Sequence, residues 1–353
     1  MISLLVVNYR SAALAAEAVR TARERTRSDL QVVVVDNSCD PREAEALRGV
    51  GDALIVSETN RGYAGAINDG RKVCTGETIV IANPDVTFGQ GALDLLHDSL
   101  REERAAVAGP ALFWDDAQEW MLPPGDLNTG TQKLGEVLAS RSRAWFEQRD
   151  RRRFLQRVAF WSLRERTAVP MLSGAVLAVR AAGFDALGGF DERFRLYFEE
   201  TDFLRRIAQS GRRIVYVPDV RCRHLFNQSA SQVAEEAAAH YARSELRYLE
   251  KWNGPFAGRL LKKLERPIRG YEARDLDGPL DLDVLSGPPG SQPGEVVVEV
   301  SPLPTFATAA GHFPASRRVE LPPDVRASLR GDFYLRAVVR ATGEVLGTYR
   351  IRA

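Results

Sequence analysis

The stretch from Gln31 to Ser38 reads QVVVVDNS, and it decides how the N-terminal half of the chain is interpreted. Four consecutive valines are typical of a strand buried on both faces, as in a parallel sheet. Three further apolar runs of strand length lie in the first hundred residues, at Ile2–Val7, Ala53–Ser57 and Thr78–Ala82. Segments of helical composition separate the runs, at Ala12–Arg25, Arg42–Gly49 and Gly62–Cys74. This alternation predicts an α/β fold with a doubly wound, mostly parallel sheet.

Polar residues follow each of these four strands. They are Asn8, Asp36 with Asn37, Glu58–Gly62, and Asn83 with Asp85. In open α/β sheets the ligand binds beyond the carboxyl ends of the strands, so these residues are candidate ligand contacts. An acid in the position of Asp36 can accept a hydrogen bond from a ribose hydroxyl or a base imide. It can equally cap the next helix, and the sequence leaves both interpretations open.

The segment Asn60–Gly70, NRGYAGAINDG, combines small residues with two asparagines. Small residues from Gly62 onward let a backbone approach closely, and a helix that begins here would present its N-terminus to a diphosphate. Asn68 would lie one to two turns into that helix. The alternative is a helix that packs tightly against the sheet.

A single carboxylate follows the fourth strand in Ile81–Val86, IANPDV. Asp85, with Asn83 two residues before it, offers the oxygen ligands that Mg²⁺ or Mn²⁺ prefers. Such an ion would neutralise charge on a departing nucleoside diphosphate. Taken alone, an Asn-Pro-Asp-Val tetrapeptide is also a common turn.

The segment Gly188–Arg206 contains five carboxylates within twelve residues, among aromatic side chains. Apolar neighbours raise the pKa of a carboxyl group and adapt it to take a proton from a sugar hydroxyl. A capped helix start, with ion pairs to Arg205 or Arg206, is the structural alternative.

Together, in this order and spacing, these segments resemble the family 2 glycosyltransferases of the GT-A fold. Asn-Pro-Asp in place of Asp-x-Asp resembles the rhamnosyltransferase-like branch, which builds bacterial surface polysaccharides. The resemblance covers about residues 1–255. It implies an inverting, metal-dependent transfer of a sugar from a dTDP- or UDP-sugar to a hydroxyl of a glycan or lipid-linked acceptor.

The resemblance also assigns roles to individual residues. Asp36 would contact the base, and Asp85 and His224 would bind the metal. Glu200 occupies the position of the catalytic base, where the family usually has Asp, and Asp202 is the nearest substitute. Ser173 and Gly174 match the family's sugar- and acceptor-side Gly-Ala segment. With the strand-end and helix residues, the predicted nucleotide-sugar contacts are Asn8, Asp36, Asn37, Asn60, Gly62, Asn68, Asn83, Ser173 and Gly174.

A basic stretch, Ser140–Arg166, is not explained by catalysis. It holds nine arginines against three acids, and Phe154, Val158 and Trp161 would share one helix face. Such a helix can lie on an anionic membrane surface, near a lipid-linked acceptor. The alternative is a helix that packs its aromatic residues on the protein itself.

Composition changes near Gly270. We predict a catalytic domain with C-terminal helices over residues 1–269, a linker over 270–294 and a small all-β, sandwich-like domain over 295–353, with a hairpin turn at Thr342-Gly343.

The net charge of +1 argues against a nucleic-acid partner, and three scattered cysteines against a disulfide framework. The apolar N-terminus is of strand length rather than a signal peptide. We therefore expect a cytoplasmic protein, peripheral on the inner face of the membrane or not attached to it, that could form homo-oligomers. A weakly catalytic carbohydrate-binding or scaffold protein and a nucleotidyltransferase are the alternative functions.

Overall fold

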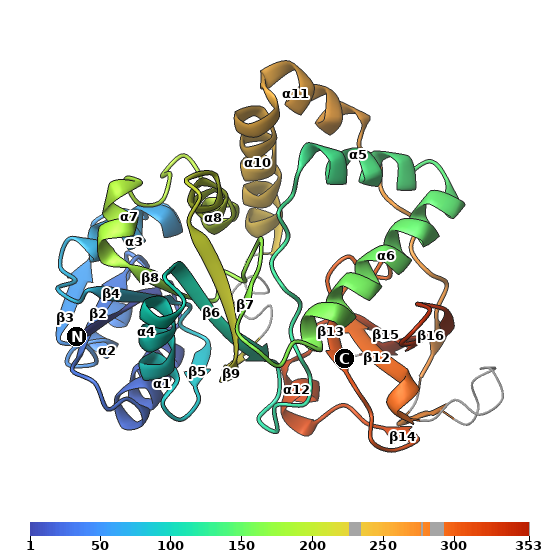
Figure 1. Ribbon diagram of the computed structural model, residues 1–353, viewed down its shortest axis with the longest axis horizontal. Coiled ribbons are helices and arrows are strands. Elements are labelled where there is room, and N and C mark those ends of the chain that lie inside the picture. Colours follow the sequence, from blue (N-terminus) through green and yellow to red (C-terminus); the bar gives the residue numbers. More distant parts are fainter. Residues whose placement is uncertain (226–233, 277, 283–292, 353) are drawn as a thin grey trace. The chain divides into compact units, whose positions relative to one another are not determined.

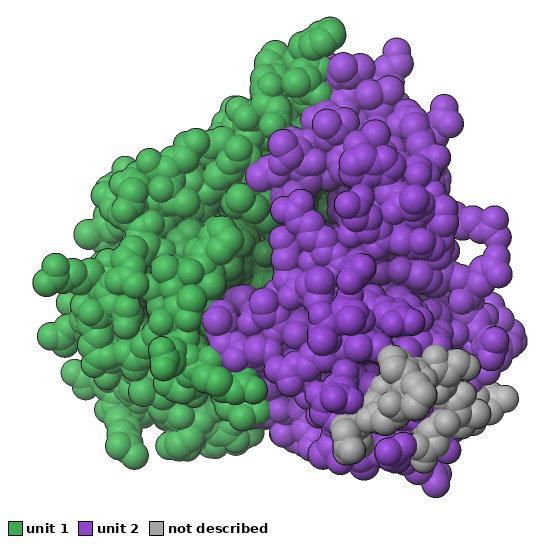
Figure 2. Space-filling model, turned by 45° about the vertical axis from the view of Figure 1, so that its right-hand side comes forward, with its two compact units in different colours: residues 1–112, 124–128, 164–258 green, residues 113–123, 129–163, 259–353 purple. Residues whose placement is uncertain are grey.

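The computed structural model describes residues 1–225, 234–276, 278–282 and 293–352. The chain divides into two compact units. Unit 1 comprises residues 1–112, 124–128 and 164–258, and unit 2 comprises residues 113–123, 129–163 and 259–353 (Figure 2). These units are drawn differently from the predicted domains, because residues 129–163 are grouped with the tail. Part of the predicted linker, residues 277 and 283–292, lies outside the described residues.

A nine-stranded sheet forms the centre of unit 1, in the order β3-β2-β1-β4-β8-β6-β9-β5 with β7 beside β9 (Figure 1). Strands β1, β2, β3 and β4 pair in parallel, while β8 runs antiparallel to β4. The strands are β1 Ile2–Asn8, β2 Leu30–Asp36, β3 Ala53–Val56, β4 Thr78–Ala82, β5 Val86–Phe88, β6 Ala105–Phe113, β7 Thr167–Ala168, β8 Val176–Arg180 and β9 Arg213–His224. The predicted α/β class is confirmed. Every residue of β1 and β4 is buried, as the apolar runs predict.

Helices cover both faces of this sheet, with α1 and α4 on one side and α3, α7 and α8 on the other (Figure 1). The helices before the tail are α1 Ala12–Arg25, α2 Pro41–Ala46, α3 Gly62–Arg71, α4 Ala92–Glu102, α5 Gly130–Ala139, α6 Arg143–Trp161, α7 Ala181–Ala186, α8 Glu199–Gln209, α10 Ala234–Asn253 and α11 Pro255–Leu264. Among the described residues, no helix is both long enough and apolar enough to cross a membrane.

Unit 2 contains a five-stranded sheet in the order β10-β16-β15-β12-β13, and a separate two-stranded sheet of β11 and β14. Its elements in the tail are β10 Arg274–Asp275, β11 Leu280–Asp281, the 3₁₀ turn η2 Pro293–Glu295, β12 Val296–Ser301, β13 Ala310–His312, β14 Arg318–Val319, α12 Pro323–Ser328, β15 Asp332–Val339 and β16 Val345–Arg352. The predicted small β-rich C-terminal region is thus confirmed. The predicted hairpin is also present, because β15 and β16 pair antiparallel around Gly343, whose φ is 71°.

One face of the five-stranded sheet is covered by helix α6 rather than by a second large sheet. Phe154, Val158 and Trp161 of α6 form a buried cluster with Val297 of β12 and Val338 of β15. The stripe that was a candidate membrane contact therefore faces the interior of unit 2. The interpretation as a helix that packs its aromatic residues inside the protein is the one that the structure shows. The expected second sheet of a sandwich is absent from this face. Helix α6, which lies far upstream in the chain, covers the sheet in its place.

Buried charges join α6 to the same sheet. Arg336 of β15 is fully buried and pairs with Asp150 at 2.5 Å and with Glu299 at 2.7 Å. Glu299, also fully buried, accepts from Arg157 at 2.8 Å. Tyr271 donates its hydroxyl to Asp150 at 2.7 Å. Arg157 of the basic stretch is thus structural, because it balances an acid inside unit 2.

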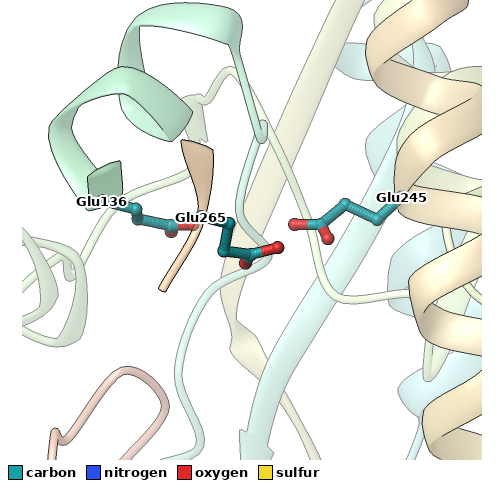
Figure 3. Close-up of side chains that lie close together, drawn as sticks. All are labelled: Glu136, Glu245 and Glu265. Carbon is teal, nitrogen blue, oxygen red and sulfur yellow. The ribbon is translucent and has the colours of Figure 1, made fainter. Parts of the chain in front are cut away.

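A second charge cluster in unit 2 surrounds the buried ammonium of Lys133. The ammonium group of Lys133 pairs with Glu136 at 3.2 Å and with Glu265 at 2.5 Å. Figure 3 labels these two carboxylates. Because an ammonium group already balances Glu136 and Glu265, this acidic cluster does not require a metal ion.

Candidate active site

Strand pairing brings Asp85 and His224 together. Asp85 follows β4, and the next residue, Val86, pairs with His224 at the end of β9. The Nε2 atom of His224 lies 3.2 Å from Oδ1 of Asp85. Apart from this contact, the buried oxygen has no hydrogen-bond partner among the described residues. One carboxylate oxygen and one imidazole nitrogen, held this close, are a donor set that suits a divalent cation. The two predicted metal ligands therefore fit that role.

Asn83 and Tyr63 border this pair. The hydroxyl of Tyr63, in the first turn of α3, donates to Oδ1 of Asn83 at 3.1 Å. Nδ2 of Asn83 lies 3.5 Å from Nε2 of His224. The backbone N–H of Asn83 donates to the carbonyl of Ala175 at 2.9 Å. The segment after β4 is thereby tied to the segment that contains Ser173 and Gly174.

Two glutamates begin helix α8, of which Glu199 is buried and Glu200 is partly buried. Burial is the largest cause that raises the pKa of both Glu199 and Glu200, and the charge of Glu200 raises the pKa of Glu199 further. One oxygen of each, Oε2, has no hydrogen-bond partner in the described part of the chain. Buried carboxyl groups with unsatisfied oxygens and raised pKa values are typical of groups that exchange protons at neutral pH.

Gly174 makes room for the longer side chain at the base position. A Cβ atom on Gly174 would lie 2.6 Å from Cγ of Glu200, closer than any van der Waals contact allows. Glu200 therefore packs directly over the backbone of this segment. The absence of a side chain at residue 174 thus leaves room for Glu200, the predicted base.

An unusual backbone turn presents the two glutamates. Tyr197 and Phe198 are consecutive non-glycine residues with φ values of 67° and 70°, a left-handed conformation that costs energy for each. Side chains of α10 hold the turn. The ring of Phe198 lies 5.2 Å from the rings of Tyr241 and Tyr248, and Ser244 donates its hydroxyl to the carbonyl of Leu196 at 2.8 Å.

Asp202, the alternative base, is fully buried, and both of its carboxylate oxygens accept hydrogen bonds. Its Oδ2 accepts from Arg206 at 2.8 Å. Its Oδ1 accepts from the indole of Trp252 at 3.0 Å and pairs with Lys251 at 2.7 Å. A carboxylate that is bonded to two cations and an indole holds α8 against α10, and it has no free oxygen to take a proton.

Asp36 and Asn8 occupy neighbouring strand ends, as predicted, with different roles. The amide of Asn8 donates to Oδ1 of Asp36 at 3.0 Å and to Glu43 at 2.9 Å, and its oxygen accepts from Ser11. Oδ2 of Asp36 is buried, with no hydrogen-bond partner among the residues that the structure describes. Asn8 therefore orients Asp36, and Asp36 keeps one oxygen for a ligand.

The remaining predicted contacts build the loops around these groups. Asn37 donates to Asn60 at 3.1 Å and accepts from the backbone of Arg61. Asn68 binds the backbone of Phe190 through both ends of its amide. Gly62 has a φ of 73°, and a Cβ there would lie 2.6 Å from the carbonyl oxygen of Arg195. These side chains connect the α3 segment to its neighbours.

Charges from both parts of the candidate site act on Tyr63. Burial is the largest cause that raises the pKa of Tyr63. Three carboxylates raise the pKa further, those of Glu199, Glu200 and Asp85. Independent of these charges, Glu200 packs over Gly174, and the adjacent Ala175 accepts a hydrogen bond from the backbone N–H of Asn83, two residues before Asp85.

Comparison with known proteins shows the family of this chain. A family model described as "Glycosyltransferase like family 2" matches residues 1–251. The chain belongs to this glycosyltransferase family. Its GT-A-type α/β fold was therefore correctly predicted. The family match covers the segments that carry the site residues.

Curated relatives of this glycosyltransferase are rhamnosyltransferases, consistent with the rhamnosyltransferase-like branch. The N-acetylglucosaminyl-diphospho-decaprenol L-rhamnosyltransferase of Mycobacterium tuberculosis is 28% identical over 248 residues, which is 65% of this chain and 78% of that protein. Rhamnosyltransferase WbbL of Escherichia coli is 28% identical over 85 residues, 24% of this chain and 32% of that protein.

Solved structures with a similar fold are more distant. Mannosyltransferase PcManGT from Pyrobaculum calidifontis, in complex with GDP-Man and Mn²⁺, has a TM-score of 0.48 and 18% identity, and the match covers 74% of this chain and 69% of that chain. GalNAc-T7 with UDP, GalNAc and Mn²⁺ has a TM-score of 0.47 and 13% identity, with 75% and 54% covered.

Sequence reasoning gave no role to two residues of the site, Glu199 and Tyr63. Glu199 was visible as the neighbour of Glu200, but its burial follows from the turn at Tyr197 and Phe198. Tyr63 stands in a glycine- and alanine-rich segment, where a single large polar side chain was the available signal.

Proposed function

We propose that this glycosyltransferase is an inverting, metal-dependent enzyme that moves a sugar from a dTDP- or UDP-linked donor to a hydroxyl acceptor. One observation carries the proposal. Asp85, Glu199 and Glu200 each have a buried, unsatisfied oxygen, and the segment Gly174-Ala175 contacts both Glu200 and Asn83, two residues before Asp85. Buried polar atoms normally have partners, so their absence among the described residues marks places for a ligand.

Roles follow from the chemistry of each group. Glu200 takes the proton of the acceptor hydroxyl while the hydroxyl oxygen attacks the anomeric carbon of the donor. The new C–O bond forms opposite the bond to the diphosphate, which breaks, so the configuration inverts. Asp85 and His224 would hold Mg²⁺ or Mn²⁺, which supplies charge neutralisation for the departing diphosphate. Oδ2 of Asp36 accepts a hydrogen bond from the nucleoside, since Asn8 occupies only Oδ1.

The names of the relatives support rhamnose as the sugar and a lipid-linked glycan as the acceptor. Both follow from the name of the mycobacterial relative, which acts on a decaprenol-linked acceptor. We accordingly place the enzyme in bacterial surface polysaccharide or glycoconjugate synthesis, at the inner face of the membrane. The division into a catalytic domain over 1–269 and a β-rich accessory domain over 295–353 stays part of this proposal.

Donor binding tests the proposal. A donor present with Mn²⁺ at about a hundredfold excess over its dissociation constant is expected to stabilise the fold by roughly 2–3 kcal/mol. We expect this thermal shift with dTDP-rhamnose or a UDP-sugar, and we expect Asp85→Asn to lose most of it. Asp98→Asn, a change of an exposed acid on α4, is the matched control. An Asp85→Asn protein stabilised as strongly as the parent would remove the metal role.

The same preparation distinguishes the alternative enzyme class. A glycosyltransferase releases the nucleoside diphosphate from its donor, whereas a nucleotidyltransferase exchanges pyrophosphate. Release of pyrophosphate from a nucleoside triphosphate and a sugar 1-phosphate, with no nucleoside diphosphate formed from a nucleoside-diphosphate sugar, would contradict the proposal.

A further inference from the structure

Helix α11, Pro255–Leu264, exposes two large apolar side chains on one face. Phe256 is 80% exposed, the highest value of any large apolar residue that the structure describes, and Leu260 is 43% exposed. Residues four apart in a helix are neighbours on its surface, so these two side chains lie next to each other. A single exposed apolar residue is ordinary, but adjacent ones form a patch that marks an interaction surface.

The packing of Gly258 determines which face of α11 is exposed. Gly258 is buried, and a Cβ atom there would lie 2.6 Å from the backbone nitrogen of Glu250 in α10. This side of α11 therefore lies directly against the backbone of α10. A step of two residues turns a helix by about 200°, so Phe256 and Leu260, two residues on either side of Gly258, point away from α10. The helix cannot rotate to bury them without losing its closest contact.

The helix and the residues after it are strongly basic. Between Pro255 and Arg269 there is one acid, Glu265, and it already pairs with two lysines. Lys263 is exposed and lies one turn after Leu260 on the same face. Apolar side chains bordered by basic ones are complementary to an anionic lipid surface, where the headgroups attract cations and the acyl-chain boundary accepts apolar groups. The basic residues of this segment are Arg259, Lys262, Lys263, Arg266 and Arg269.

We infer that Phe256, Leu260 and Lys263 dock α11 onto the surface of an anionic lipid bilayer. The helix has ten residues and is about 15 Å long, roughly half the thickness of the hydrocarbon core, so it lies in the plane of the interface. The apolar face of α6 cannot make this contact because it is buried. The inference rests on the proposed function for its purpose, since docking would bring the enzyme to a lipid-linked acceptor.

Phe256→Ser tests the apolar part of the contact. We expect the full parent chain to co-sediment with vesicles of phosphatidylglycerol mixed with phosphatidylcholine. The variant is expected to lower the partition coefficient about tenfold, because the ring no longer leaves water on binding. The matched control is Val56→Ser on β3, which replaces an apolar residue that is 50% exposed and is expected to leave vesicle binding unchanged.

Lys263→Gln and Arg266→Gln test the charged part. Each is expected to weaken binding to the mixed vesicles about fivefold, and the parent should bind vesicles of phosphatidylcholine alone much more weakly than the mixed ones. Equal binding of the parent to both kinds of vesicle, or parental binding by Phe256→Ser, would overturn the inference. So would a parent that binds no vesicles but forms dimers that Phe256→Ser dissociates, because the patch would then belong to a second copy of the chain.

The thermal shift with donor and Mn²⁺ separates this inference from the proposed function. The Phe256→Ser protein is expected to keep the parental shift, which also shows that it is folded. A parent that gives the donor shift but binds no vesicles would overturn the inference and leave the proposed function intact. A parent that binds the mixed vesicles through Phe256 but gives no donor shift would support the docking surface and contradict the proposed function.

Discussion

Glu200→Gln is expected to lower kcat by about 10²–10⁴-fold, the usual contribution of a positioned general base. The amide fills the same space over Gly174 but cannot take a proton from the acceptor. Asp85 and His224 are unchanged, so donor binding with Mn²⁺ should remain near the parental level. A loss confined to kcat, with donor affinity retained, is the result that identifies a base.

The same variant should be harder to unfold at neutral pH, by on the order of 1 kcal/mol. Burial raises the pKa of Glu200 above its value in the unfolded chain, so its ionised form opposes folding. Below the unfolded value of about 4.3 both states are protonated and the cost is absent. The cost develops as the pH rises toward and through the raised pKa of the folded state. Urea unfolding of parent and variant at acidic and neutral pH should therefore differ only at neutral pH.

Asp202→Asn is the matched control for both measurements. Asp202 pairs with Arg206 and Lys251, so its replacement should destabilise the fold at neutral pH, opposite in sign to Glu200→Gln. If Asp202→Asn abolished turnover in a stably folded protein while Glu200→Gln retained the parental kcat, Asp202 would be the base.

Glu299→Ala is expected to destabilise unit 2 by about 3–5 kcal/mol, because it leaves two buried arginines without their shared partner. Arg157 and Arg336 are both buried against this carboxylate, between α6 and the sheet. Loss of a buried ion-pair partner costs more than loss of a surface pair, since the remaining charges cannot reach water.

Tryptophan fluorescence reports on this change directly. Four of the five tryptophans, Trp114, Trp120, Trp145 and Trp161, lie in unit 2, so the unfolding transition seen by fluorescence is mainly that of unit 2. Glu272→Ala, which removes one partner of an ion pair that is 87% exposed on both sides, is the control and should leave the urea midpoint unchanged. A Glu299→Ala midpoint equal to that of the control would show that the buried network does not stabilise unit 2.

Much of the α/β fold was predictable because buried parallel strands carry unbroken apolar runs. Val32–Val35 and Ile79–Ala82 fall in β2 and β4, and the polar residues after them lie at the predicted sheet edge. The role of Asp202 was less accessible to sequence. Arg206 is one helical turn away, but Lys251 and Trp252 come from α10, about fifty residues later in the chain.

Sequence could not show what covers the apolar face of the basic stretch, for a similar reason. Helical periodicity correctly grouped Phe154, Val158 and Trp161 on one face. The partners of that face, Val297 and Val338, lie well over a hundred residues downstream and pair with each other across two strands. Periodicity shows that a face is apolar, but only the tertiary structure shows what covers it.

Glu200 and Asp85 must serve one reaction centre if this chain works as proposed, and a single titration tests that. The pKa of the Glu200 carboxyl is measured by ¹³C NMR on glutamate-labelled protein, assigned with Glu200→Gln, with and without saturating Mg²⁺. A cation held at Asp85 favours the ionised form of a carboxyl in the same site, so Mg²⁺ is expected to lower the pKa of Glu200 in the parent and not in Asp85→Asn. A Glu200 carboxyl that titrates identically with and without Mg²⁺ would contradict the shared site.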